Sequence, residues 1–240
     1  MIVIAGDSWG CGCWDTEQTV YQVYHRGLEQ YLHDDGHQVI NLSEGGLSLE
    51  FTAQRLKDFL SIQKPLFVKD TIKVFVFQTE WHRGKESLQG SIVPMLSLDS
   101  SIEDYNRFEN IGDDHKIMAS FYGILSHLAT KHNTPIYLIG GCSDTIWIDD
   151  FENHYPGLSI VCQSFTNLLV NNNHRIDTPV HSVRFPADLL NKEHCVDLAI
   201  LGQQREKVWQ ANPEWMYPDG AHPNHLGHKK LYEHIKGVLT

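Results

Sequence analysis

The sequence predicts an α/β fold in which one parallel sheet is covered by helices on both faces. Short apolar runs typical of strands alternate along the chain with longer segments of helical periodicity, the pattern of repeated strand–helix–strand units. The run from Thr71 to Phe77 is almost entirely apolar, as expected of a parallel strand buried on both faces. Because the candidate site described below uses residues from both ends of the chain, we expect a single domain over residues 1–240.

The strands are predicted from short apolar runs that end at turn-forming residues. The runs of this kind are 2–5, 38–42, 71–77, 135–139 and 180–185. The segments 79–100 and 141–157 follow two of these strands, and their many turn-forming residues predict loops. Because the carboxyl ends of parallel strands meet at one edge of a sheet, both loops are expected to face a site there.

The helices are predicted from periodicity and from capping residues. Asp15 with Gln18 three residues later is typical of a helix N-terminus, and Gly36 is typical of a helix end. Ser48 is the expected N-cap of a second helix, which ends before Pro65. The expected helices are 15–35, 47–63, 102–132 with an interruption near Gly112, 158–170, 186–210 and 223–238.

The composition excludes several classes of partner. The chain has 19 basic and 30 acidic residues and a formal net charge of −11. Such a surface repels phosphate backbones, and no basic patch with interleaved aromatic residues is present, so we expect no nucleic-acid binding. The same charge disfavours an anionic membrane surface. The charge is also what a simple requirement for solubility would produce.

Cysteine usage and the first residues bear on the compartment. The five cysteines are an odd number without the spacing of a disulfide framework, which favours reduced thiols. Cys11 and Cys13 are too close for an ordinary disulfide and lack the two-residue gap of a redox motif. The chain opens on a strand-like run without a basic segment before it, and no run is long enough for a membrane span. We therefore expect a cytoplasmic protein without signal peptide or transmembrane segment.

Two short segments at opposite ends of the chain carry the chemistry. Gly6-Asp7-Ser8 follows the first strand, and Asp219-Gly220-Ala221-His222-Pro223-Asn224 precedes the last helix. Together they supply the serine, histidine and aspartate of a nucleophilic triad. Ser8 is the expected nucleophile, His222 its general base and later the acid for the leaving alkoxide, and Asp219 the carboxylate that orients His222. Pro223 is expected at the first position of the last helix.

These motifs resemble those of the SGNH/GDSL hydrolases. Gly6-Asp7-Ser8, the pair Asp219 and His222, and a strand that ends in Asn41 with Gly46 five residues later occur in the family's order over the whole chain. The resemblance implies a three-layer α/β/α, flavodoxin-like fold with a parallel sheet of about five strands. It also implies an ester hydrolase that needs no metal and no cofactor.

The resemblance implies an oxyanion hole with one group missing. Two of its donors would be the backbone N–H groups of Ser8 and Gly46. The family's third donor is the asparagine of a Gly-x-Asn-Asp segment after the third strand, where this chain reads Gln78-Thr79-Glu80-Trp81-His82. Loss of one such donor costs about 3–4 kcal/mol of transition-state stabilisation. Gln78 and Thr79 are the expected substitutes, with Trp81 and His82 also near in sequence.

The expected substrate is a small-molecule or carbohydrate ester. Family analogy and the aromatic residues of the loops favour O-acetyl groups on carbohydrate. Alternatives remain open: an acyltransferase on the same scaffold, a catalytically weak or inactive module that binds glycan or protein, and a plain turn at Gly6-Asp7-Ser8. His222, His225 and His228 recur every three residues, so a metal site is a further alternative, although no carboxylate or cysteine supplies an evident fourth ligand. The oligomeric state is not predicted.

Overall fold

A parallel sheet forms the centre of the protein. The structure is a computed structural model that describes residues 1–15, 22–63, 71–78, 111–141, 145, 151–170, 214–215 and 222–239. In the order β4-β1-β5-β6-β7, every neighbouring pair of strands is parallel. The strands are β1 (Ile2–Ala5), β4 (Val39–Asn41), β5 (Lys73–Gln78), β6 (Ile136–Gly140) and β7 (Leu158–Cys162). The predicted α/β class, the three layers and the five-stranded parallel sheet are confirmed.

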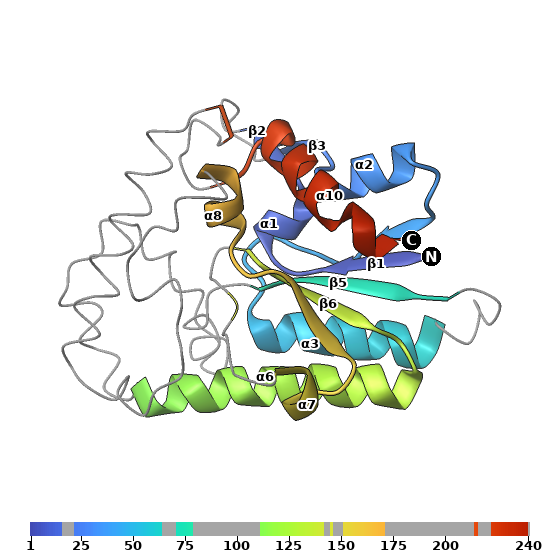
Figure 1. Cartoon of the computed structure of the whole chain (residues 1–240), viewed down its shortest axis with the longest axis vertical. Coiled ribbons are helices and arrows are strands. Elements are labelled where there is room, and N and C mark those ends of the chain that lie inside the picture. The colour runs from blue at the N-terminus through green and yellow to red at the C-terminus, as the bar shows by residue number, and fades with distance from the viewer. Residues whose placement is uncertain are drawn as a thin grey trace.

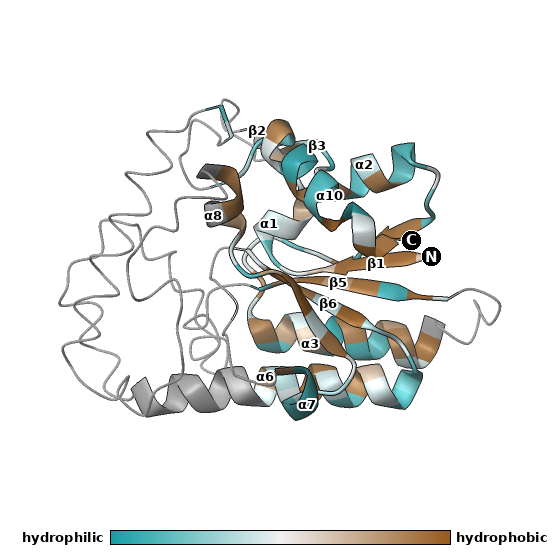
Figure 2. Cartoon of the chain, in the orientation of Figure 1, coloured by the Kyte–Doolittle hydropathy of each residue, from teal (hydrophilic) through white to brown (hydrophobic). Residues whose placement is uncertain are grey.

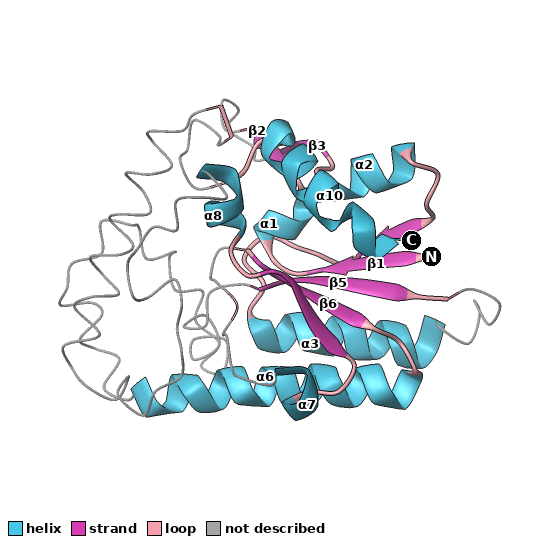
Figure 3. Cartoon of the chain, in the orientation of Figure 1, coloured by secondary structure: helices cyan, strands magenta, loops and turns pink. Residues whose placement is uncertain are grey.

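Helices cover both faces of the sheet (Figure 1). Figure 3 separates these helices from the strands by colour. One face carries α3 (Leu49–Asp58), its π-helical continuation (Phe59–Gln63), α6 (Ile111–His132) and α7 (Phe151–His154). The other face carries α1 (Ser8–Cys11), α2 (Leu28–Asp34), α8 (Phe165–Val170) and α10 (His225–Leu239).

Alternation along the strands divides the core into two clusters. In β5, Val74 and Val76 pack with α3 and α6, whereas Phe75 and Phe77 pack with α2, α8 and α10. Both sets are fully buried, as a strand between two helical layers requires. Figure 2 shows these strands as largely hydrophobic, while the helices combine hydrophobic and hydrophilic residues.

Hydrogen bonds join the end of the last helix to β5, the central strand of the sheet. The Lys73 ammonium group, at the start of β5, donates to the carbonyls of Val238 and Leu239 at distances of 2.8 and 2.9 Å. These carbonyls belong to the helix end, where no backbone N–H is available, and a cation there is favoured by the helix dipole. Leu231 and Ile235 of the same helix are fully buried against the sheet.

The predicted helix over 15–35 is wrong for part of the segment that the structure describes. Cys13–Asp15 and Gln22–His25 form an antiparallel pair, β2 and β3, and among the described residues of this segment only Leu28–Asp34 is helical. Residues 16–21 lie outside the described residues. Asp15 therefore lies in a strand and is not an N-cap. The cause is Gly27, whose φ of +54° breaks the helical path, and whose position leaves no room for a Cβ next to His228.

The predicted helix over 158–170 is also wrong in its first half. Leu158–Cys162 forms β7, the fifth strand, with Leu158 paired to Ile136 of β6, and Phe165–Val170 forms α8. Ile160 and Val161 favour a strand because they are β-branched, and Gly157, with a φ of +82°, makes the turn into it. The strand predicted over 180–185 and the helix over 186–210 lie outside the described residues.

The remaining predictions concern the Ser48 cap, the long helix near Gly112 and the two loops, and their outcomes differ. The Ser48 side chain accepts a hydrogen bond from Phe51 N, which confirms it as an N-cap. Helix α6 begins at Ile111 and includes Gly112, while residues 102–110 lie outside the described residues, so the interruption expected near Gly112 stays a prediction. The short helix α7 lies inside the predicted loop 141–157, and the loop 79–100 lies outside the described residues. Among the helices that the structure describes, none has the length and apolar character needed to cross a membrane.

We expect Gly27→Ala to destabilise the protein far more than Gly36→Ala. Both glycines have positive φ, which costs an L-residue about 1–2 kcal/mol. A Cβ at Gly36 would meet nothing within 4 Å, whereas a Cβ at Gly27 would lie 2.7 Å from Gly12 Cα and 2.8 Å from His228 Nδ1. Overpacking of this kind adds about 1–3 kcal/mol. Urea unfolding of the two variants measures the difference, and equal losses of stability would contradict this account of the β3–α2 junction.

Candidate active site

The nucleophile motif forms a tight connection from β1 into α1. Gly6 has a φ of +149°, and a Cβ there would lie 2.7 Å from Phe77 Cβ of the adjacent strand, so the chain passes β5 only because the residue is glycine. The Asp7 side chain accepts a hydrogen bond of 3.0 Å from Trp9 N and is the N-cap of α1. Ser8 is the first residue of this helix and is 9% exposed.

The histidine reaches this serine from the other end of the chain. His222 Nε2 lies 3.0 Å from Ser8 Oγ, although 214 residues separate the two. At this distance the serine hydroxyl donates to the ring nitrogen when the imidazole is neutral and carries its proton on Nδ1. The contact therefore unites the two sequence motifs in one site.

The Asn224 side chain holds the segment that carries His222. It accepts a hydrogen bond of 3.0 Å from Gly227 N, the third residue of α10, and donates to Glu214 O at 2.9 Å. Asn224 is thus the N-cap of α10. The prediction that Pro223 occupies the first helical position is wrong, because the helix begins at His225. Asp219 lies outside the described residues, so its place in the triad stays a prediction.

Three of the predicted oxyanion groups lie at or just after the carboxyl ends of three neighbouring strands. Ser8 follows β1, Gly46 lies in the connection after β4, and Gln78 is the last residue of β5. The order β4-β1-β5 is the point where the chain reverses its direction of travel across the sheet, and open α/β sheets bind ligands at such points. Gly46 has a φ of +79°, and a Cβ there would meet nothing within 4 Å. Thr79, Trp81 and His82 lie outside the described residues.

The Gln78 side chain is buried and oriented by a tyrosine that sequence reasoning missed. The Tyr122 hydroxyl donates a hydrogen bond of 2.5 Å to Gln78 Oε1, and both residues are at most 1% exposed. The Tyr122 ring packs edge-on against Phe151 and Tyr155. Because Oε1 accepts from the tyrosine, the donor group of this amide is Nε2. Tyr122 lies 44 residues away on α6, and no pattern in the sequence links it to Gln78.

The three histidines of the alternative metal site do not converge. His222 contacts Ser8, whereas His228 is fully buried, with its ring 5.6 Å from the ring of Phe165. His225 Nδ1 lies 3.5 Å from the Tyr24 hydroxyl. Within the part of the chain that the structure describes, no group of three histidine, cysteine or acidic residues could hold a metal ion.

Burial governs the ionisation of one histidine and two thiols beside the site. It lowers the pKa of His228 to about 3, with His25 and His222 nearby adding to the effect, so His228 is neutral at physiological pH. It also raises the pKa of the Cys11 and Cys13 thiols to about 12, with the Asp7 carboxylate contributing at Cys11. Cys11 and Cys13 form no disulfide. The two thiols closest in sequence to Ser8 are therefore protonated and are poor nucleophiles.

Comparison with known proteins gives structural neighbours only. No protein-family model matches the chain, and no curated protein matches it. The chain is similar to TesA, at 15% identity and a TM-score of 0.43, over 100% of this chain and 97% of that one. It is also similar to the psychrotrophic esterase EstA from Pseudoalteromonas sp., in a structure inhibited by monoethylphosphonate, at 14% identity and a TM-score of 0.46, with 99% and 97% covered.

A third neighbour is the lipase/acylhydrolase from Enterococcus faecalis, at 14% identity and a TM-score of 0.37, with 99% of this chain and 95% of that chain covered. At this level of similarity, the case for hydrolase chemistry in this chain rests on its own residues, above all on the contact between Ser8 and His222.

We expect the stability of the protein to fall in acid because of His228. Its pKa is lowered from 6.5 to about 3 in the folded chain, so the unfolded chain binds the proton first. The contribution of neutral His228 to the free energy of unfolding is therefore complete above pH 6.5. As the pH falls toward 3, this contribution is lost by up to about 1.4 kcal/mol per pH unit. His228→Gln removes this titration and should flatten the dependence of unfolding free energy on pH. Urea unfolding between about pH 7 and pH 4 measures it, and an unchanged slope in the variant would contradict the assignment.

Proposed function

We propose that this chain is a serine ester hydrolase in which Ser8 is the nucleophile, His222 the general base and Asp219 the carboxylate that orients His222. The observation that carries the proposal is the 3.0 Å contact between Ser8 Oγ and His222 Nε2. A serine hydroxyl is a weak nucleophile until a base within hydrogen-bond reach can take its proton, and this contact provides that base.

The reaction proceeds in two halves. Ser8 Oγ attacks the ester carbonyl while its proton passes to His222 Nε2, and the tetrahedral intermediate collapses as the histidine returns that proton to the leaving alkoxide. Water then takes the place of the alcohol, gives a proton to His222 and attacks the acyl-serine. Collapse of the second intermediate releases the carboxylic acid, and the proton returns to Ser8 Oγ.

The oxyanion of each intermediate needs donors in place before the reaction. We assign them to the backbone N–H groups of Ser8 and Gly46, with Gln78 or Thr79 in the role of the missing asparagine. The position of Gln78 at the end of β5, and the hydrogen bond from Tyr122 that fixes the orientation of its amide, favour Gln78. Tyr122 holds that amide in orientation.

The proposed substrates are esters with small or moderate acyl groups, and O-acetyl groups on carbohydrate are preferred. A net charge of −11 favours neutral esters over polyanionic substrates. The same acyl-serine would serve an acyltransferase if a sugar or alcohol entered in place of water, and product analysis with and without an acceptor alcohol separates the two reactions.

The contact between Ser8 and His222 supports one domain over residues 1–240.

We expect a fluorophosphonate probe to label the protein at Ser8 only. The probe reacts with serines that a base activates, so the intact mass should rise by one adduct in the wild-type chain and stay unchanged in Ser8→Ala. His222→Ala, which keeps Ser8 but removes its base, should lower hydrolysis of p-nitrophenyl acetate by at least about 10⁴-fold. A folded wild-type chain without an adduct would refute the proposal and favour a binding module.

We expect Gln78→Leu to lower kcat for p-nitrophenyl acetate by about 10²–10³-fold with little change in KM, because an oxyanion donor acts mainly in the transition state. Tyr122→Phe removes only the hydroxyl that orients Gln78 and should lower kcat by a smaller factor. Tyr155→Phe is the matched control, since it removes a hydroxyl from the same aromatic cluster but leaves the bond to Gln78. Full kcat in Gln78→Leu would exclude Gln78 as the donor.

A further inference from the structure

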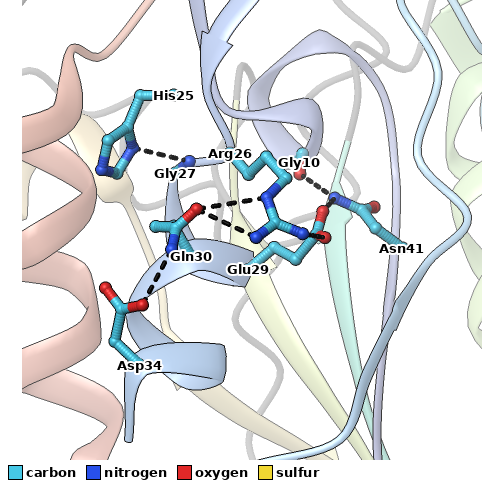
Figure 4. Close-up of polar contacts among 8 residues, drawn as sticks. All are labelled: Gly10, His25, Arg26, Gly27, Glu29, Gln30, Asp34 and Asn41. Carbon is cyan, nitrogen blue, oxygen red and sulfur yellow. Dashed lines mark hydrogen bonds and ion pairs between the residues drawn. The ribbon is translucent and has the colours of Figure 1, made fainter.

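Asn41 connects three segments of the chain with a single side chain. It is the last residue of β4, and its Nδ2 donates to the Gly10 carbonyl of α1 at 3.0 Å and to Glu29 Oε2 of α2 at 3.2 Å. Its Oδ1 accepts a hydrogen bond of 3.0 Å from Ser43 N in the connection to α3. Figure 4 shows the Asn41 amide between Gly10 and Glu29. Both the nitrogen and the oxygen of the Asn41 amide therefore form hydrogen bonds.

Two of these segments carry the proposed oxyanion donors. Gly10 lies two residues after Ser8 in the same short helix, and Ser43 lies three residues before Gly46. The segments also touch directly, because Glu44 N donates to Gly6 O at 3.2 Å and a Cβ at Gly10 would overlap with Ser43 Oγ. A shift in the Asn41 amide would therefore move the two backbone donors relative to each other.

The third segment gives the amide a fixed support. Glu29 is paired with Arg26 at 2.8 Å, and the Arg26 guanidinium also donates to Gln30 Oε1 through Nε and Nη2. Gln30 in turn donates to Asp34 at 2.8 Å (Figure 4). Arg26 lies just before α2, and Glu29, Gln30 and Asp34 belong to it, so the carboxylate that accepts from Asn41 is held by contacts at the start of α2.

We propose that Asn41 is a positioning residue, which sets the placement of the Ser8 and Gly46 backbone donors through its bonds to Gly10 and Ser43. This inference rests on the proposed function, since the donors matter only if an oxyanion forms. Asn41 does not touch the reacting atoms. It acts through the helix that carries the nucleophile and through the connection that carries Gly46.

Asn41→Asp tests the proposal with almost no change in shape. The introduced aspartate still accepts from Ser43 N, but it cannot donate to Gly10 O, and it places a second negative charge beside Glu29. We expect kcat for p-nitrophenyl acetate and the rate of fluorophosphonate labelling to fall on the order of 10- to 100-fold, with KM little changed, because small displacements of catalytic groups are this costly. Glu29→Gln is the matched control: its amide carbonyl still accepts from Asn41, so kcat should stay near the wild-type value.

The double variant Glu29→Gln/Asn41→Asp separates positioning from stability. The glutamine introduced at position 29 can donate to the aspartate introduced at position 41, and the repulsion between two carboxylates is gone. The urea midpoint should therefore recover toward wild type. The Gly10 carbonyl still lacks its donor from position 41, so kcat should stay low. If Asn41→Asp alone does not fold, the double variant provides the measurement.

Three outcomes would overturn the inference. The first is a wild-type kcat in folded Asn41→Asp, and the second is recovery of kcat together with stability in the double variant. Either would leave Asn41 a purely structural role. Ser8 labelling in the wild-type chain would show that the proposed function still holds. A wild-type chain that neither labels nor turns over ester would instead refute the proposed function, and the inference would fall with it.

Discussion

The site depends on the docking of α10 against the sheet, because the start of that helix brings His222 to Ser8. Leu231 and Ile235 bury its apolar face, Lys73 of β5 binds the carbonyls at its far end, and Asn224 caps its beginning. The result is a 3.0 Å contact between side chains 214 residues apart. Hydrophobic burial supplies most of the stability of such an arrangement, while the polar contacts at the two helix ends fix its position.

The strand order then determines what surrounds this pair. With β1 between β4 and β5, the three chain segments that leave these strands must begin side by side at one edge. Ser8, Gly46 and Gln78 belong to these segments. Amide side chains then link the segments to the layers behind them: Asn41 links α1 to α2, and Gln78 links β5 to Tyr122 on α6. Both helical layers therefore contribute to the shape of one sheet edge.

Local patterns in the sequence were sufficient to predict the elements that form mainly through local interactions. The apolar run of β5, the Ser48 cap and the last helix were predictable within a few residues, because each depends on its neighbours in sequence. The β2–β3 pair was missed because Gly27 adopts its conformation against His228, a contact that no local pattern reports. Strand β7 was read as a helix because a short apolar run has no clear period. Tyr122 and the partners of Asn41 were missed because only the fold brings them together.

The wide separation of Ser8 and His222 along the chain has a consequence for synthesis. A ribosome makes Ser8 214 residues before it makes His222. While the intervening segment is being translated, Ser8 lacks the base that the proposed function assigns to it, and a serine without a base is a weak nucleophile. Under the proposed function, an incomplete chain released early would carry the serine without its base. Attack on esters would then be restricted to chains in which the last helix has been made and has folded into place.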